Sequence, residues 1–80
     1  MTKNEFLKAI ADALGVSVEQ VTMQSSQSDL ENWDSLGHLT ILQVLDEKTG
    51  GRLDAAKGVG NSTTAQSLWD TLSVAGLTTE

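Results

Sequence analysis

The stretch NWDSLGHL, residues 32–39, decides how this chain is organised. Apolar residues follow Ser35 with a helical period as far as Leu45, so Asp34 or Ser35 is predicted to begin a helix. Unpaired backbone N–H groups and the positive end of the helix dipole gather at such an N-terminus, which suits an attached phosphate. Asp34 and Ser35 are also ordinary N-cap residues, so the same spacing fits a helix that is merely capped.

This helix is predicted to run to about Thr49 and to end before Gly50 and Gly51. One side of it is expected to face the core, and that side carries Ile41, Leu42, Leu45 and Thr49. Leu36 and Leu39 fall on another side. They are expected to stay exposed beside Ser35 as a docking surface, although single exposed leucines are also common without a function.

Capping patterns place the first helix. Thr2 and Glu5 have the spacing of a capping box, and apolar residues then recur at helical intervals until Gly15, where the helix is predicted to stop. Ser17 and Gln20 make a second, weaker box, enough for one turn.

Two polar segments separate the remaining elements. Residues 22–32 are predicted to form a long loop, pinned to the core by Val21, Met23 and Leu30. Residues 53–62 contain two glycines and are expected to hold at most one short turn. Thr64 is the predicted N-cap of a last helix, which Gly76 should end, with Trp69 at the edge of its apolar stripe.

These elements predict an all-α fold, a small up-and-down bundle of three main helices plus a short third helix or turn. The 80 residues allow one domain over residues 1–80. The chain has no Cys, which excludes a disulfide framework and a thiolate metal site. Its apolar patches are too short to span a bilayer and no signal-peptide pattern opens the chain, so a cytoplasmic protein is expected.

The net charge of −6 is unevenly distributed. Between residues 9 and 47 there is no Lys or Arg, and the acidic residues there are Asp12, Glu19, Asp29, Glu31, Asp34, Asp46 and Glu47. Such a field repels nucleic acid and anionic membranes, and it steers basic protein surfaces toward Ser35. The same charge could also serve only as a solubilising face.

The Asp34-Ser35-Leu36 tripeptide at the head of a helix, after a long loop and within acidic surroundings, resembles the acyl carrier proteins. The likeness in element order covers nearly the whole chain. It implies a monomeric carrier, not an enzyme, whose Ser35 is esterified with phosphopantetheine by a separate phosphopantetheinyl transferase that uses coenzyme A. It also implies a surface read by that transferase and by acyl-loading and acyl-using enzymes such as synthases and acyltransferases, formed by Asp34, Leu36, Leu39, Asp46 and Glu47.

Gly37 and Thr40 stand where carriers of fatty-acid synthesis usually have acidic residues. The expected pathway is fatty-acid, polyketide or other specialised acyl synthesis, and this departure favours the specialised polyketide or other dedicated pathways over fatty-acid synthesis. A peptidyl or aminoacyl carrier and an unmodified acidic interaction domain are the alternatives. Gly37 costs about 1 kcal/mol in a helix relative to Ala, so a local reason is expected, namely close approach of the arm or a partner. The N–H groups of Leu36 and Gly37 are expected near the phosphate.

His38 is the only histidine, and it could in principle be the base of an Asp34, Ser35, His38 hydrolase. No nucleophile-elbow motif or oxyanion-hole pattern accompanies it, so a partly buried histidine packed against the loop is expected instead. Asp29, Glu31 and Asp34 match no metal-ligand spacing. Trp69 is expected to close the core, whereas Trp33 is open between a structural role and a role beside the serine.

Overall fold

The structure is a computed structural model of the chain and describes residues 1–56, 58 and 62–79. Its elements, in chain order, are α1 (Lys3–Leu14), η1 (Val18–Gln20), α2 (Ser35–Lys48), η2 (Leu53–Ala55) and α3 (Ala65–Val74). The described residues form three α-helices and two 3₁₀ turns without a strand, which confirms the all-helical class. In that part of the chain no helix has the length and apolar character to cross a membrane.

The predicted capping box begins α1. The Glu5 N–H donates to Thr2 Oγ1 at 3.2 Å, and the Thr2 N–H donates to the Glu5 carboxylate at 3.0 Å. The bond from the Thr2 backbone, followed by that with its side chain, lowers the pKa of Glu5, because both favour the charged carboxylate. Gly15 ends the helix in the left-handed conformation with φ 70°, as its position predicted.

The boundaries of α2 agree with the sequence. Asp34 is its N-cap, and Gly50 and Gly51 follow its last turn with φ of 69° and 79°. Of the residues expected to face the core, Ile41, Leu45 and Thr49 are buried and Leu42 is half-buried.

Thr64 caps α3, since its Oγ1 accepts a hydrogen bond of 3.0 Å from the Ser67 N–H. The helix ends at Val74, two residues before Gly76. The expected core role of Trp69 is confirmed, because its ring is buried and its centroid lies 5.2 Å from that of Phe6 on α1. Between α2 and α3, the short third element is the 3₁₀ turn η2, and residues 57 and 59–61 of the predicted 53–62 segment lie outside the described residues.

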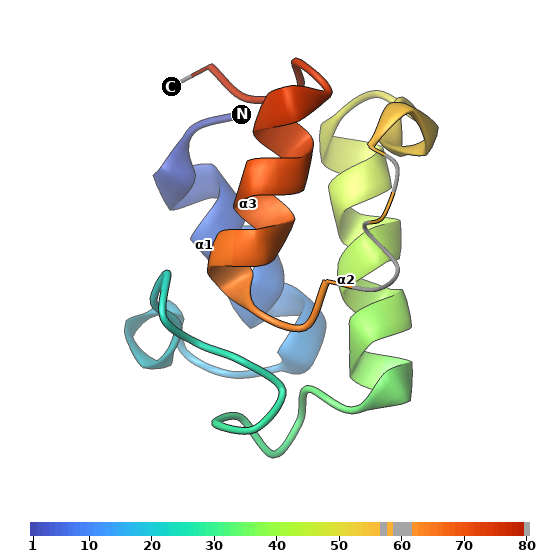
Figure 1. Cartoon of the computed structure of the whole chain (residues 1–80). Helices are drawn as coiled ribbons and strands as arrows, with labels where there is room; N and C mark the ends of the chain where they lie inside the picture. The colour runs from blue at the N-terminus through green and yellow to red at the C-terminus, as the bar shows by residue number, and fades with distance from the viewer. Residues whose placement is uncertain (57, 59–61, 80) are drawn as a thin grey trace.

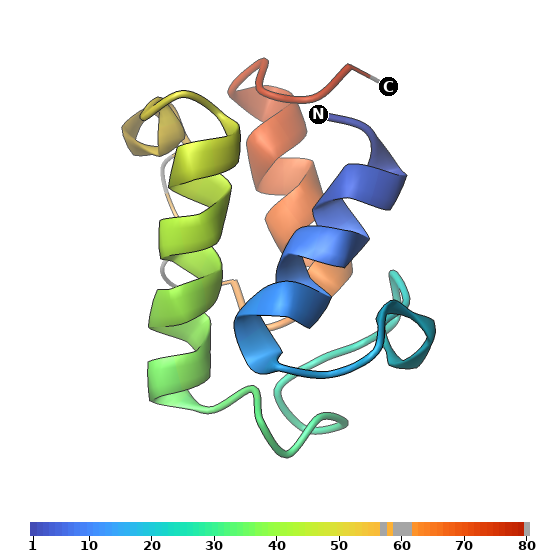
Figure 2. The same cartoon turned by 180° about the vertical axis from the view of Figure 1, so that it is seen from behind.

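Figures 1 and 2 show that α1 runs opposite to both α2 and α3, so α2 and α3 run in the same direction. The predicted up-and-down order therefore does not hold for the three main helices, because the segment that contains η2 returns the chain to the end of the bundle where α2 begins. The side chains between the helices form one core, and the largest fully buried ones are Trp33, Phe6, Ile10, Ile41, Leu45, Leu68 and Leu72. Trp33 comes from the loop before α2, so this loop contributes to the core as the helices do.

Backbone hydrogen bonds and apolar contacts hold the long loop against the core and the start of α3. Val21 is buried, and Met23 and Leu30 pack against the core, as predicted. The sequence did not indicate the backbone bonds that accompany them: the Gln27 N–H donates to the Thr63 carbonyl at 3.0 Å, and the Ala65 N–H donates to the Ser25 carbonyl at 2.8 Å. This short antiparallel bridge holds the middle of the loop against the end of the bundle where α2 begins (Figures 1 and 2).

Candidate functional site

Ser35 occupies the first position of α2 and is exposed to solvent. The preceding residue fixes this position, because the Asp34 carboxylate accepts a hydrogen bond of 2.8 Å from the Gly37 N–H and the Asp34 carbonyl accepts one of 2.8 Å from the His38 N–H. The helix therefore starts at the serine and presents its hydroxyl at the helix end.

The backbone donors at this end differ from the prediction in one respect. The Gly37 N–H is occupied by the Asp34 carboxylate, so it cannot face an attached phosphate as expected. The N–H groups of Ser35 and Leu36, at the first two helix positions, have no intrahelical acceptor. These two donors are the ones that the helix end offers to an anion at the serine.

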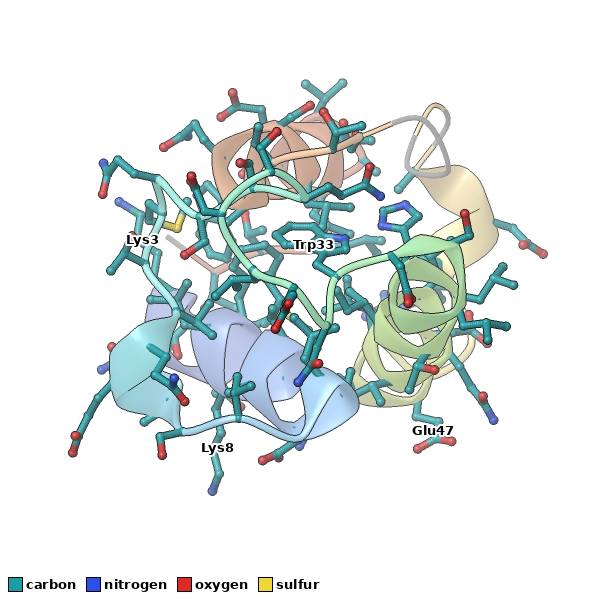
Figure 3. The ribbon with its side chains drawn as sticks, turned by 90° about the horizontal axis from the view of Figure 1, so that it is seen from below. Lys3, Lys8, Trp33 and Glu47 are labelled. Atoms are coloured by element: carbon teal, nitrogen blue, oxygen red, sulfur yellow. The ribbon has the colours of Figure 1, made fainter. Side chains whose placement is uncertain are left out.

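A buried hydrogen bond joins Trp33, two residues before Ser35, to His38, three residues after it. The Trp33 indole Nε1–H donates to His38 Nδ1 at 3.0 Å, with 1% of Trp33 and 6% of His38 exposed. The two rings are nearly parallel, 15° apart. Trp33 therefore has a structural role, and Figure 3 shows it at the centre of this end of the bundle, between the three helices.

Because of this bond, Asp34, Ser35 and His38 are not arranged as in a Ser-His-Asp triad. In a triad, Nδ1–H of the histidine donates to the aspartate. Here Nδ1 of His38 accepts from Trp33, and the Asp34 carboxylate accepts from Gly37. The expectation that His38 packs against the loop is confirmed, because its partner Trp33 is a loop residue and its side chain is buried.

Gly37 has a packing reason that differs from the expected one. A Cβ at this position would overlap the Asn32 carbonyl oxygen and come within 2.9 Å of Leu14 Cδ2. The Asn32 side chain in turn donates to the Leu14 carbonyl at 3.1 Å, at the end of α1. Gly37 thus lets the loop and α1 approach α2 on its inner side. The expectation that it clears space for an arm or a partner was wrong.

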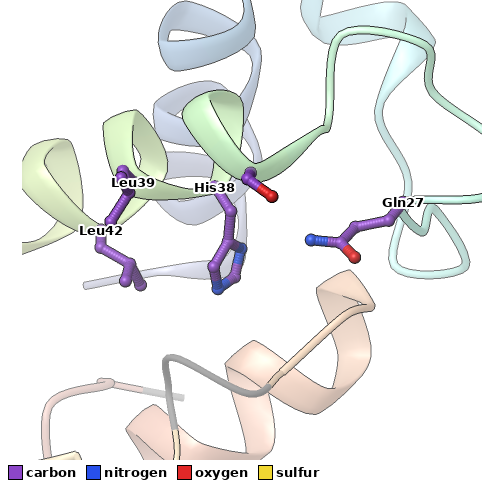
Figure 4. Close-up of a pocket in the computed structure, with 5 residues that line it drawn as sticks. Gln27, His38, Leu39 and Leu42 are labelled. Atoms are coloured by element: carbon purple, nitrogen blue, oxygen red, sulfur yellow. The ribbon is translucent and has the colours of Figure 1, made fainter.

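An open groove of about 320 Å³ lies beside the serine. Its lining residues are Gln27, Ser35, His38, Leu39 and Leu42. Figure 4 shows that His38, Leu39 and Leu42 come from α2, whereas Gln27 approaches from the loop on the other side. Gln27 could not be predicted from the sequence, because nothing in a polar loop marks one glutamine as the neighbour of a helix that begins eight residues later.

The two leucines beside the serine are exposed, as predicted: 75% of Leu36 and 62% of Leu39 are accessible to solvent. Leu39 contributes to the groove, and Leu36 is not among the groove's lining residues. Together with the exposed carboxylate of Asp34, they place apolar and acidic groups next to Ser35.

Asp46 and Glu47 lie at the other end of α2. The helical rise puts Asp46 about 17 Å along the axis from Ser35. Asp46 is half-buried and its Oδ1 accepts a hydrogen bond of 3.1 Å from the Leu53 N–H, so it also stabilises the turn after the helix. Glu47 is exposed at the outer edge of α2 (Figure 3). The structure therefore does not bring these two carboxylates to the serine, unlike Asp34.

Comparisons with protein-family models, with curated proteins and with solved structures give no significant match to this chain.

Proposed function

We propose that this chain is an acyl carrier protein in which Ser35 bears phosphopantetheine in ester linkage. The observation that carries the proposal is an exposed serine at the first position of α2, beside an open groove. When attached, the arm supplies a thiol on which an acyl group is held as a thioester. The carrier needs no catalytic base of its own, because a separate phosphopantetheinyl transferase performs the attachment.

In that attachment, Ser35 Oγ bonds to the phosphorus that bears pantetheine in coenzyme A. The bond from this phosphorus to the bridging oxygen of the pyrophosphate breaks, adenosine bisphosphate leaves, and the hydroxyl proton passes to the transferase. The chain contributes a hydroxyl held at a fixed place by the Asp34 cap. The N–H groups of Ser35 and Leu36 then favour the new phosphodiester by about 0.3–1 kcal/mol, through the helix dipole.

The surface around the serine suits a basic partner with an apolar contact. Leu36 and Leu39 supply exposed apolar area, and Asp34 supplies negative charge beside them. Asp46 and Glu47 extend the acidic surface along α2, and complementary charge raises association rates. The partners we infer are the transferase and the enzymes that load and use the acyl group, in fatty-acid, polyketide or other specialised acyl synthesis in the cytoplasm.

The order of the elements is compatible with this family. A first helix, a long loop, a helix that begins at the serine and a last helix follow one another, and the turn η2 stands between α2 and α3, at the place of the short third element. A peptidyl or aminoacyl carrier would use the same serine, and only the cargo distinguishes it.

Intact mass spectrometry tests the proposal. The purified chain, incubated with coenzyme A and a broad-specificity phosphopantetheinyl transferase, should gain the mass of one arm. Ser35→Ala should gain none, whereas Ser28→Ala, an exposed serine of the loop, should be loaded like the wild type. Failure of the wild type with several transferases would contradict the assignment.

The exposure of Leu36 and Leu39 also favours a second candidate, an unmodified acidic domain that docks a basic protein. In that case Ser35→Ala would retain full biological activity, and charge reversal at Glu47 would weaken partner binding in a salt-dependent way. Loss of activity in Ser35→Ala excludes this candidate.

A further inference from the structure

Gln27 reaches the groove beside Ser35 from the opposite wall (Figure 4). Its backbone is fixed by the N–H bond of 3.0 Å to the Thr63 carbonyl and by the neighbouring bridge between Ser26 and Thr64. Its side chain is half-buried, and within the described residues its carboxamide makes no hydrogen bond. The held backbone therefore brings to the groove a carboxamide whose donor and acceptor are both available.

The wall formed by α2 has a different character. Leu39 and Leu42 give it an apolar strip, and His38 beside them directs its Nδ1 inward to Trp33. A groove with an apolar strip on one side and one amide-pairing group on the other fits a flexible chain that alternates methylene groups with amides. The pantetheine arm has this chemistry, since it contains two amides separated by methylenes and a dimethyl group close to its phosphate.

We propose that Gln27 is the positioning residue for the arm attached to Ser35. Its carboxamide pairs with an amide of the arm, while Leu39 and Leu42 contact the methyl and methylene groups. This inference rests on the proposed function and adds a specific role for a loop residue to it.

The attachment point is the reason that the arm, rather than a free ligand, occupies this groove. Ser35 is itself a lining residue, so any group esterified there begins inside the groove. A tethered group is present at high effective concentration and loses little additional freedom on docking, so one hydrogen bond and two apolar contacts are enough to bias its direction. Because Leu36 does not line the groove, the docked arm leaves it available to a partner.

Nuclear magnetic resonance of the isotope-labelled full chain, before and after loading, tests the inference directly. The side-chain NH₂ resonances of Gln27 should shift on loading, and those of the exposed Gln43 on α2 should not. Methyl groups of the arm should show nuclear Overhauser contacts to Leu42.

Variants complete the test. Gln27→Ala should load normally, keep the wild-type backbone spectrum and lower the ratio of docked to free arm about fivefold, the factor that one net hydrogen bond supports. Gln43→Ala should leave that ratio unchanged. A loaded protein with unshifted Gln27 resonances overturns the inference while the carrier function stands. A chain that no transferase loads overturns both.

Discussion

The indole of Trp33 donates a hydrogen bond of 3.0 Å to the imidazole of His38, and these two buried residues stand on either side of Ser35 in the sequence. The indole N–H can only donate, so Nδ1 of His38 is the acceptor in this bond. The bond joins the end of the loop to the second turn of α2. The exposed serine therefore lies between two residues that are buried and joined by a hydrogen bond.

A double-mutant cycle measures this support. Trp33→Phe keeps an aromatic ring but leaves Nδ1 of His38 without its donor, so it should lower the free energy of unfolding by about 1–3 kcal/mol. His38→Leu removes the acceptor. The double variant should cost less than the sum of the two single variants by about 1 kcal/mol, measured by urea unfolding. Strict additivity would show that the bond contributes nothing.

Gly37→Ala tests the close approach of the loop to α2. Alanine favours a helix by about 1 kcal/mol over glycine, yet its Cβ would overlap the Asn32 carbonyl. We expect a net loss of about 1–3 kcal/mol in unfolding free energy, because backbone must move. Gln43→Ala, at an exposed position of the same helix, should change stability by less than about 0.5 kcal/mol. A stabilised Gly37→Ala protein would refute the steric explanation.

Substitutions of Asp34 separate its cap from its charge. Asp34→Ala removes the acceptor for the Gly37 N–H and should cost about 0.5–2 kcal/mol of stability. Asp34→Asn keeps an acceptor oxygen, so its stability should stay close to that of the wild type. Both should slow loading by a transferase at low salt, with the difference from wild type shrinking as salt is added. Equal loss of stability in the two variants would argue against the capping role.

Leu36 is expected to act in binding and not in folding. Three-quarters of its surface is exposed, so Leu36→Ala should change the free energy of unfolding by less than about 0.5 kcal/mol. Loading kinetics should show kcat/KM for the transferase reduced about tenfold, as for an apolar contact at the centre of an interface. Val74→Ala, at a 91% exposed site near the end of α3, is the control and should load normally.

The capping box of α1 should give a pH-dependent contribution to stability. The pKa of Glu5 is lowered from its ordinary 4.5, so the charged box is fully stabilising above that value and loses its contribution as the pH falls through the lowered pKa. Glu5→Gln retains a side-chain oxygen and cannot ionise. The difference in unfolding free energy between wild type and Glu5→Gln should therefore shrink in acid, and a constant difference would contradict the assignment.

Local interactions made much of the architecture predictable. The boxes and caps of Thr2, Asp34 and Thr64 join groups three residues apart, and Gly15 and Gly50 end helices through their own backbone conformation. Each of these features depends on only a few consecutive residues, so it can be recognised in the sequence. The sequence therefore determined where the three helices lie, that Ser35 begins the second one, and that Leu36 and Leu39 are exposed.

The tertiary structure alone decided what surrounds that serine. Gln27 faces the groove because backbone hydrogen bonds join its loop to Thr63 and Ala65, far along the chain. Position 37 requires a glycine because the Asn32 carbonyl and Leu14 of α1 leave no space for a Cβ there. Asp46 lies at the opposite end of α2 from Ser35. It belongs to the same acidic part of the sequence as Ser35, but it is not close to the serine in space. Contacts between distant segments depend on how helices pack together, and no short-range pattern encodes them.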